Sequence, residues 1–276
     1  AGYRVIAQPA RELKKLQRGF VELFPFPVHD CVKAYRRGIG IKDNVTPHSQ
    51  NRFLLKTDFQ SFFHSIKPKI FWSELETIPG ISYKKELLES KTEVESLLFW
   101  RPARRKDGKL ILSIGAPSSP AISNFCLYSF DLSISKWCEQ HGVVYTRYAD
   151  DLTFSTNIKG MLQKVYLQLK FILRTKWTFL TLNESKTVFA SKKTNRHVTG
   201  IVINNEGGLS LGRGKKRKIK GLVYRLKCKQ ITYDEFEWLR GYLNFIIYAD
   251  PAFFETLKKK YSSDFIMKIR CGEYYE

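Results

Sequence analysis

Residues 143–156 show the clearest hydrophobic pattern, because two runs rich in β-branched and aromatic residues flank a short acidic centre. This arrangement predicts a β-hairpin with Ala149, Asp150 and Asp151 at its turn. The tip of a hairpin is a rigid place from which carboxylates can project. Taken alone, an acidic turn without further function is the simpler interpretation, since Asp is a common turn residue.

A further acidic residue ends the apolar run of residues 52–58, which we expect to form a strand. The apolar residues that follow have helical spacing and are Phe59, Phe62, Phe63 and Ile66. Asp58 is therefore expected at a junction between a strand and a helix, where a side chain can project into a cleft. A helix N-cap is the simpler interpretation of a single Asp at such a junction.

Helical spacing, alternation and turn residues predict the remaining elements. Helices are expected at residues 11–18, 28–37, 69–100 with a break at Pro79-Gly80, 120 to near Gly142, and 162–173. Extended segments are expected at residues 110–114, 179–189, 197–203 and 209–211. Loops are expected at residues 38–48 and 115–120, and a basic turn at residues 101–109.

The composition changes at Gly212, after which basic residues crowd one short run. They are Arg213, Lys215, Lys216, Arg217, Lys218 and Lys220. The apolar residues of this region have helical spacing, which predicts an amphipathic helix with one basic face. Thr232 and Glu235 form the pattern of a capping box that opens the next helix, and Asp250-Pro251 opens another. Residues 212–276 are therefore expected to form a helical subdomain.

The overall composition is typical of a globular protein that binds a polyanion. The chain has 276 residues, of which 43% are hydrophobic and 14% aromatic, and a formal net charge of +21. This length supports two or three subdomains. The charge indicates nucleic acid as the most direct partner, and the alternative is a generally cationic protein without such a partner.

The cysteines and the apolar segments bear on the compartment. Five cysteines occur without a C-x-x-C pair, so neither a zinc site nor a disulfide framework is expected, and a reducing cytoplasm fits best. No apolar run approaches ~18 residues and no signal peptide is visible, so no membrane span is expected. Because the chain begins at Ala1 and not at Met, we expect further N-terminal residues in the natural protein.

Asp58, Asp150 and Asp151 together suggest a site for phosphoryl transfer. Adjacent carboxylates repel each other and require a positive charge beside them. Oxygen ligands favour Mg²⁺, which completes its shell with substrate phosphates. In a two-metal site the ions lie ~3.5–4 Å apart, activate the attacking hydroxyl and hold the leaving phosphate oxygens.

Motifs along nearly the whole chain resemble those of reverse transcriptases, in the same order and with the same spacing. Tyr148-Ala149-Asp150-Asp151 resembles their Tyr-x-Asp-Asp signature, and residues 57–63 resemble their first catalytic motif. Residues 115–120 with Asn124 resemble the loop and helix that lie against the template and the incoming nucleotide. Residues 183–186 resemble the fourth motif of the palm.

Other segments are similar to bacterial retron reverse transcriptases in particular. They are Gly115-Ala116-Pro117-Ser118-Ser119-Pro120, Asn44-Val45-Thr46-Pro47-His48, Val198-Thr199-Gly200 and the thumb-like residues 239–261. Val45 departs from the Ala that is usual in the retron element, which affects the subtype and not the polymerase family.

The resemblance implies an α+β fold in the form of a right hand. Residues 1–57 and 67–114 would be the fingers. Residues 58–66 and 115–211 would be a palm built on a ferredoxin-like antiparallel sheet with helices. Residues 212–276 would be a helical thumb.

The resemblance also implies a role for individual residues near the reaction. Asp58, Asp150 and Asp151 would be catalytic and would bind two Mg²⁺ ions, with the Phe59 carbonyl as a further ligand and Mn²⁺ as a substitute. The residues implied in dNTP binding are Arg4, Phe63, Ala116, Pro117, Ser118 and Lys186. Phe63 takes the place of the aromatic steric gate that rejects a 2′-OH, although either Phe62 or Phe63 must belong to the core. Lys186 would neutralise the leaving pyrophosphate, or else be a solvated turn residue.

The residues implied in nucleic-acid binding lie further from the acids. They are Asn44, His48, Arg213, Lys215, Lys216, Arg217, Lys218 and Lys220. The basic residues of the thumb would follow the backbone of the template–primer duplex. Asn44 and His48 would contact RNA or support the structure, and Arg147 is expected to brace the signature.

The partners implied by the resemblance are a cognate structured non-coding RNA, dNTPs and an effector protein of the same operon. A retron enzyme primes from the 2′-OH of an internal guanosine and makes a branched RNA–single-stranded DNA, termed msDNA, in an anti-phage defence system that can form larger assemblies. Alternatives are a group II intron or abortive-infection reverse transcriptase, and a nucleic-acid-binding scaffold whose polymerase site is idle. The intact acids argue against the scaffold.

Overall fold

The computed structural model describes residues 6–102 and 108–273. The chain forms two compact units, one made of residues 1–41 and 52–189 and the other of residues 42–51 and 190–276.

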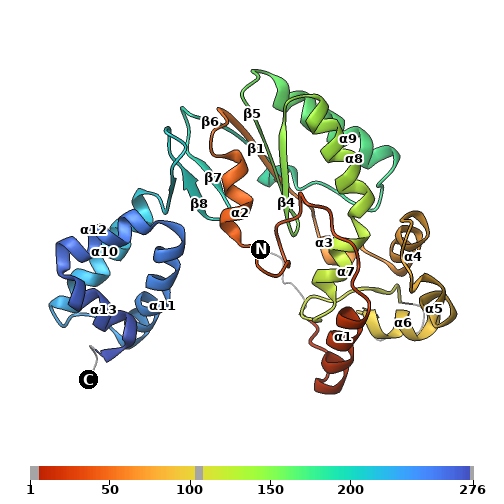
Figure 1. The fold of residues 1–276 in the computed structure, drawn as a ribbon, viewed down its shortest axis with the longest axis horizontal. Coiled ribbons are helices and arrows are strands. Elements are labelled where there is room, and N and C mark those ends of the chain that lie inside the picture. The colour runs from red at the N-terminus through yellow and green to blue at the C-terminus, as the bar shows by residue number, and fades with distance from the viewer. Residues whose placement is uncertain (1–5, 103–107, 274–276) are drawn as a thin grey trace. The chain divides into compact units, whose positions relative to one another are not determined.

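The first unit is built around a sheet with the strand order β4-β5-β1-β6 (Figure 1). Its strands are β1 (Phe53–Asp58), β4 (Val144–Tyr148), β5 (Asp151–Thr156) and β6 (Val188–Ser191), and the boundary between the units falls within β6. β5 pairs antiparallel with both β1 and β4. Helices α7 (Ser119–Cys126) and α8 (Tyr128–Gln140) precede β4, and helix α9 (Met161–Thr175) lies between β5 and β6. This βαββαβ order with β1 and β5 at the centre is the ferredoxin-like arrangement.

Helices α8 and α9 cover one face of this sheet, as Figure 1 shows. α8 packs on β4, and α9 packs on β5 and β1. The buried residues of α9 are Leu162, Val165, Leu169, Ile172 and Leu173, which the helical spacing predicted. They join Phe130, Phe154 and Leu55 in one hydrophobic core, so the sheet that carries the acidic residues has a rigid support.

The segment between β1 and α7 contributes short helices and a small hairpin to the same unit. Helices α4 (Pro68–Thr77), α5 (Lys84–Glu89) and α6 (Lys91–Leu98) confirm the helices expected over 69–100, with Pro79-Gly80 between α4 and α5. The hairpin pairs β2 (Phe99–Trp100) with β3 (Ile111–Leu112). α1 (Arg11–Leu23) packs against α6. The basic turn expected at 101–109 lies largely outside the described residues.

The helix predicted over residues 28–37 is wrong. Val32 instead forms a bridge with Arg147 in β4, and backbone hydrogen bonds join Lys33 N to Arg147 O and Arg147 N to Cys31 O. The segment therefore satisfies its backbone groups against the edge of the sheet. Tertiary pairing of this kind overrides local helical spacing.

The loop predicted over residues 38–48 is also wrong in part. It contains helix α2 (Ile41–Val45) and the 3-10 helix η1 (Thr46–His48), in which Pro47 occupies an N-terminal position that tolerates proline. The helix expected after Asp58 is short, because α3 (Phe62–Ser65) ends at Ile66. The helix expected from 120 to 142 is broken at Leu127 into α7 and α8.

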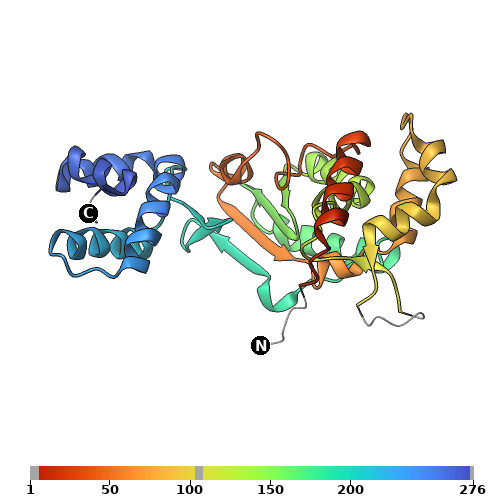
Figure 2. The ribbon, with the colours of Figure 1, turned by 90° about the horizontal axis from the view of Figure 1, so that it is seen from below.

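The second unit consists of a small antiparallel sheet and a group of helices. The sheet contains β7 (Arg196–Val198), β8 (Ile201–Ile203) and β9 (Leu209–Ser210). The helices are α10 (Arg213–Lys227), α11 (Tyr233–Ala249), α12 (Pro251–Tyr261) and α13 (Ser263–Cys271). α10, α12 and α13 each contact α11, and Figure 2 shows them side by side. The capping box of Thr232 and Glu235 is formed, and the side chain of Asp250 caps α12.

Two expectations about the environment of the chain can be compared with the structure. Among residues 6–102 and 108–273, no helix combines the length and apolar character needed to cross a bilayer. Cys31, Cys126 and Cys138 are buried, Cys228 and Cys271 are exposed, and all five are free thiols. The division into fingers, palm and thumb at the boundaries given above stays a prediction.

Candidate active site

The sheet register brings the three acidic residues of the motifs together. Asp58 at the end of β1 lies directly opposite Asp151 at the start of β5. Tyr148 pairs with Asp151 across the hairpin, so Ala149 and Asp150 form its two-residue turn. The backbone N–H of Phe59 donates a 3.1 Å hydrogen bond to the carbonyl of Asp150, which ties the turn to β1. Acidic side chains that are 92 residues apart in sequence therefore share one edge of the sheet.

The backbone beside these acids is strained. Ala149 in the turn has a φ of 58°, Ser61 after β1 has 47°, and Tyr35 has 60°. Side chains with a Cβ rarely adopt this left-handed conformation, and such residues gather at functional sites. All three line the same cavity of about 550 Å³, together with Asp150 and Phe63.

The cavity has an aromatic wall. The other residues that line it are Phe62, His64, Trp100, Pro102 and Ile114. Phe62 belongs to the buried core, whereas Phe63 is only partly buried and packs against that core. The rings of Phe62 and Phe63 lie 5.5 Å apart. Both rings line the cavity, and Phe63 is the more exposed of the two aromatic residues that sequence could not separate.

Asp58 is a buried carboxylate with a lysine beside it. The residue is 4% exposed, and Nζ of Lys186 lies 2.6 Å from its Oδ2. Its Oδ1 is buried and has no hydrogen-bond partner among the described residues. Lys186 comes from η2 (Glu184–Lys186), the turn that resembles the fourth palm motif, so two of the motifs meet at this ion pair.

The electrostatics of Asp151 reflect the crowding of negative charge. Its pKa is raised, first because the surrounding protein keeps water from the carboxyl group and then because Asp150 and Asp58 lie nearby. Lys56 and Lys186 act in the opposite direction. A raised pKa in a group of carboxylates is what like charges held together produce.

The set of oxygen atoms at this edge of the sheet is chemically suited to bind a hard cation such as Mg²⁺. It offers carboxylate oxygens from neighbouring strands and one buried oxygen of Asp58 that has no hydrogen-bond partner among the described residues. Within residues 6–102 and 108–273, however, no group of three or more His, Cys, Asp and Glu side chains is close enough to hold a metal ion. The backbone register is thus in place, while the carboxylates are not gathered as a complete ligand set.

Arg147 and Asp131 form a buried ion pair, of which the sequence predicted only the role of Arg147. Arg147 and Asp131 are both fully buried, and the guanidinium donates to both carboxylate oxygens, with 2.6 Å from Nη2 to Oδ2. The hydroxyl of Tyr145 also donates to Asp131, at 2.8 Å. Burial disfavours the charged guanidinium, but attraction by Asp131 and the hydrogen bonds to it outweigh this and raise the pKa of Arg147.

This ion pair supports the strained turn directly. Nη1 of Arg147 donates to the carbonyl of Ala149 at 3.0 Å and to Oδ1 of Asn124 at 3.2 Å. Asn124 in α7 in turn donates to the carbonyl of Ala34 at 3.0 Å. The network confirms that Arg147 braces the signature, and it adds Asp131 as a residue that the motif analysis missed.

The other predicted nucleotide-binding residues are distributed unevenly. Ala116 and Ser118 are buried and Pro117 is partly buried at the start of α7, and none of these three lines the cavity beside Asp150. The hydroxyl of Ser118 is buried without a hydrogen-bond partner among the described residues. Arg4 lies outside the described residues.

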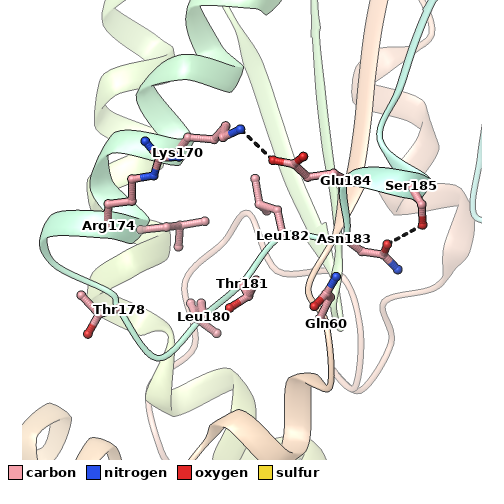
Figure 3. A pocket seen from close by; sticks show the side chains of 11 residues that line it. Gln60, Lys170, Arg174, Thr178, Leu180, Thr181, Leu182, Asn183, Glu184 and Ser185 are labelled. Carbon is pink, nitrogen blue, oxygen red and sulfur yellow. Dashed lines mark hydrogen bonds and ion pairs between the residues drawn. The ribbon is translucent and has the colours of Figure 1, made fainter. Parts of the chain in front are cut away.

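A second cavity of about 640 Å³ lies between α9 and the segment that leads into η2 (Figure 3). Lys170 and Arg174 of α9 line one wall, and residues 180–185 line the opposite wall. Figure 3 shows the ion pair of Lys170 with Glu184, whose Nζ and Oε1 atoms are 2.7 Å apart. Glu184 and Lys186, the first and last residues of η2, therefore each form an ion pair.

Asn44 and His48 are completely buried in the second unit. The amide of Asn44 lies 3.5 Å from the hydroxyl of Thr199. Burial lowers the pKa of His48 to about 3, so its imidazole is neutral. Of the two roles that sequence left open, support of the structure agrees with this burial.

The burial of His48 predicts a pH dependence of stability. An unfolded chain binds the His48 proton near pH 6.5, whereas the folded protein does so only near pH 3. Between these values the unfolded state binds more protons. As the pH falls below about 6.5, the free energy of unfolding should therefore decrease by about 1.4 kcal/mol per pH unit, which amounts to about 2 kcal/mol at pH 5 relative to neutral pH. Urea unfolding at pH 7 and pH 5 measures this difference. His48→Gln should reduce this difference, and equal pH slopes for His48→Gln and wild type would contradict the assignment.

The basic run is helical, as predicted, and its cations differ in their surroundings. Arg213, Lys215, Arg217 and Lys218 are exposed on α10. Nζ of Lys218 lies 4.3 Å from the ring centre of Trp238, an exposed aromatic residue of α11. Lys216 is different, because its Nζ lies 2.7 Å from Oδ2 of the buried Asp250. That lysine has a structural partner within the unit, which the run of positive charges did not indicate.

Comparison with known proteins agrees with the motifs and the geometry. Residues 1–203 match the family model described as reverse transcriptase (RNA-dependent DNA polymerase). The chain is 39% identical to the Retron Ec83 reverse transcriptase of Escherichia coli, over 98% of this chain and 86% of that protein. It is 29% identical to the Retron Ec86 reverse transcriptase of Escherichia coli, over 97% of this chain and 80% of that protein.

A solved structure supports the fold. The apo telomerase of Candida tropicalis superposes with a TM-score of 0.50 at 13% identity, over 96% of this chain and 54% of that chain. This likeness concerns the fold alone, and it agrees with the mixed helices and antiparallel sheet expected of a right-hand polymerase. The chain thus belongs to the reverse transcriptases, the RNA-directed DNA polymerases, and among them to those of bacterial retrons.

Proposed function

We propose that this enzyme copies a cognate structured non-coding RNA into the DNA of a branched RNA–DNA molecule, by nucleotidyl transfer at Asp58, Asp150 and Asp151. The observation that carries the catalytic part is the sheet register, which pairs Asp58 with Asp151 and sets Asp150 in the adjacent turn. The polymerase family supplies the reaction, and the retron relatives support the class of template.

Divalent cations would be held by Asp58 and Asp150, with Asp151 beside them and the Phe59 carbonyl as a further oxygen. Bound Mg²⁺, or Mn²⁺ in its place, would activate the primer hydroxyl and neutralise charge on the triphosphate. The protein itself positions the carboxylates through the β1–β5 pairing and through the hydrogen bond from Phe59 N to Asp150 O. Lys186 supplies a positive charge at the same edge of the sheet.

The dNTP sugar would occupy the cavity lined by Asp150 and Phe63. Its volume of about 550 Å³ is in the range of small-molecule sites. Phe63 lines it beside Ala149 and Asp150, so a sugar lying against that ring would be close to the acids. Ala116, Pro117 and Ser118 would contribute from the start of α7, and Arg4 would contact the triphosphate.

Phe63→Ala should weaken the discrimination between dNTPs and rNTPs. The aromatic ring would exclude the 2′-OH, and pocket contacts of this size are worth ~1–3 kcal/mol, or about 10–200-fold in specificity. The measurement is the ratio of kcat/KM for dGTP and GTP on a primed RNA template. Phe171→Ala is the matched control, because Phe171 is 60% exposed on α9 and does not line the cavity. An unchanged ratio in Phe63→Ala would contradict a gate at this position.

The basic face of α10 would bind the backbone of the template–primer duplex. Arg213, Lys215, Arg217 and Lys218 are exposed there, with Lys220 on the same helix. Contacts of this type recognise an A-form helix by its phosphates, 2′-OH groups and shape. Lys216 would contribute less, because it is paired with Asp250.

The product distinguishes a retron enzyme from other reverse transcriptases. We therefore propose purification of the wild-type protein and of Asp150→Ala/Asp151→Ala from cells that carry the native operon. The wild type should copurify with single-stranded DNA joined to RNA, resistant to RNase and sensitive to DNase, while the double variant should carry RNA only. The same RNA without DNA on both proteins would instead support a nucleic-acid-binding scaffold.

The cellular setting follows from this proposal. The retron assignment supports a cytoplasmic enzyme that acts with an effector protein of the same operon in anti-phage defence. Copurification from the native operon tests the effector as well, because a second operon-encoded protein should be retained with the wild-type complex. Loss of that protein from the double variant would show that its binding requires the DNA product.

A further inference from the structure

Lys186 forms an ion pair with the carboxylate of Asp58, which the proposed function assigns as a ligand of a divalent cation. Its Nζ atom lies 2.6 Å from Oδ2 of Asp58, which is short enough for a charge-assisted hydrogen bond. The side chain of Asp58 is 5% exposed, whereas that of Lys186 is 56% exposed. The carboxylate is thus withdrawn from water, while most of the lysine remains hydrated.

This ion pair meets an electrostatic need of the metal-free site. Asp58 lies opposite Asp151, and Asp150 is next to it in the hairpin turn. A buried carboxylate without a positive partner is strongly destabilising. Lys186 supplies such a partner, and it contacts one oxygen of Asp58 while Oδ1 has no hydrogen-bond partner among the described residues.

The turn that carries Lys186 is fixed, but its side chain can move. The N–H of Asn183 donates to the carbonyl of Asp58 at 2.8 Å, and the N–H of Lys186 donates to the carbonyl of Asn183 at 3.1 Å. In the same turn, Glu184 is paired with Lys170. Because lysine has a flexible stem of four carbons, its ammonium group can leave Asp58 while the backbone stays in place.

We propose that Lys186 is an exchangeable counter-ion of Asp58, which holds the carboxylate in the metal-free enzyme and is displaced when a divalent cation binds. The inference rests on the proposed function only for the role of Asp58 as a metal ligand. The displaced ammonium group remains within one side-chain length of Asp58, where the phosphates of a dNTP need a positive charge. Metal binding and nucleotide binding are thereby coupled through one residue.

The coupling has a measurable consequence for metal affinity. Two cations compete for Asp58, so the metal-free enzyme should bind a divalent cation less tightly than a variant without the ammonium group. We expect Lys186→Met to bind Mn²⁺ on the order of tenfold more tightly in the absence of nucleotide and RNA, since a partly exposed ion pair opposes binding only moderately. Lys170→Met is the matched control, because it removes the neighbouring ion pair with Glu184 and leaves Asp58 untouched.

The experiment combines two measurements on the full chain. Free Mn²⁺ is followed by electron paramagnetic resonance during titration of wild type, Lys186→Met and Lys170→Met. Lysine acetylation of the wild type is then followed by mass spectrometry with and without Mg²⁺, which requires no variant to fold. Acetylation of Lys186 should increase when Mg²⁺ is added, whereas that of Lys170 should stay the same.

Equal or weaker Mn²⁺ binding by Lys186→Met, or an unchanged acetylation of Lys186, would overturn the inference. The proposed function is tested separately, by dNTP incorporation on a primed RNA template. A wild-type protein that binds Mn²⁺ and releases Lys186 but incorporates no dNTP would overturn the proposed function and leave the exchange intact. Normal incorporation with no release of Lys186 would overturn the exchange alone.

Discussion

Asp150→Asn should reduce primer extension about a thousandfold, while the protein remains folded and binds RNA as the wild type does. The substitution keeps the shape of the side chain and removes its charge beside Asp58 and Asp151. Charge stabilisation at metal-assisted phosphoryl transfer is worth several kcal/mol, and a loss of about 4 kcal/mol corresponds to about a thousandfold in rate. The turn itself should persist, because its backbone is tied to β1 by the hydrogen bond from Phe59 N to Asp150 O.

The measurement is single-turnover incorporation of one dNTP on a primed RNA template with Mg²⁺, together with the melting temperature of the protein. Asp30→Asn is the matched control, because the side chain of Asp30 is 97% exposed and carries the same change. It should keep the wild-type rate. An Asp150→Asn rate within about tenfold of wild type would exclude Asp150 from the reaction. Asp58 and Asp151 would then be the remaining candidates for catalytic acids.

The acidic edge of the sheet could be predicted because its signals are local. β-Branched and aromatic residues on both sides of Asp150 determine a hairpin, and a one-residue shift of the register would move every side chain to the other face. The change from strand to helical spacing after Asp58 likewise marks where β1 ends. Sequence could not give the direct pairing of Asp58 with Asp151, which depends on strands that are far apart in the chain.

The wrong predictions concern segments whose structure depends on contacts with distant parts of the chain. Residues 28–37 have helical spacing, yet Val32 bridges to Arg147 in β4 and the backbone pairs there. Residues 38–48 contain Gly and Pro at a density typical of loops, yet Asn44, Val45 and His48 are fully buried and the segment is helical. In both cases packing outweighs local preference, and no local signal reports it.

The buried ion pair that supports the site was the hardest feature to predict from the sequence. Asp131 lies within α8, where an acidic residue is most simply taken as part of a solvated face. Its position one turn before Ile134 and two turns before Cys138 places it on the buried face of that helix. An acidic residue at an apolar position of a helix was therefore the signal that a buried partner existed, and Arg147 in β4 is that partner.

Arg147→Met should destabilise the protein by about 3–5 kcal/mol, because it leaves Asp131 buried without its positive partner. Both residues of this pair are 0% exposed, so water cannot replace the guanidinium. Small globular domains have unfolding free energies of about 5–15 kcal/mol, so the variant should retain only part of its stability. Urea unfolding at pH 7 measures the loss. Lys85→Met is the control, because Lys85 and its partner Glu89 are both mostly exposed and such pairs contribute about 1 kcal/mol or less.

The double variant Arg147→Met/Asp131→Leu separates the buried charge from the packing. Removal of both charges leaves no uncompensated ion, so the double variant should be more stable than Arg147→Met alone, and the non-additivity measures the coupling. Its activity should stay low all the same, because Arg147 also donates to the carbonyl of Ala149 and so holds the strained turn that presents Asp150. Recovered stability with recovered activity would show that the guanidinium only compensates Asp131 and that the turn needs no brace.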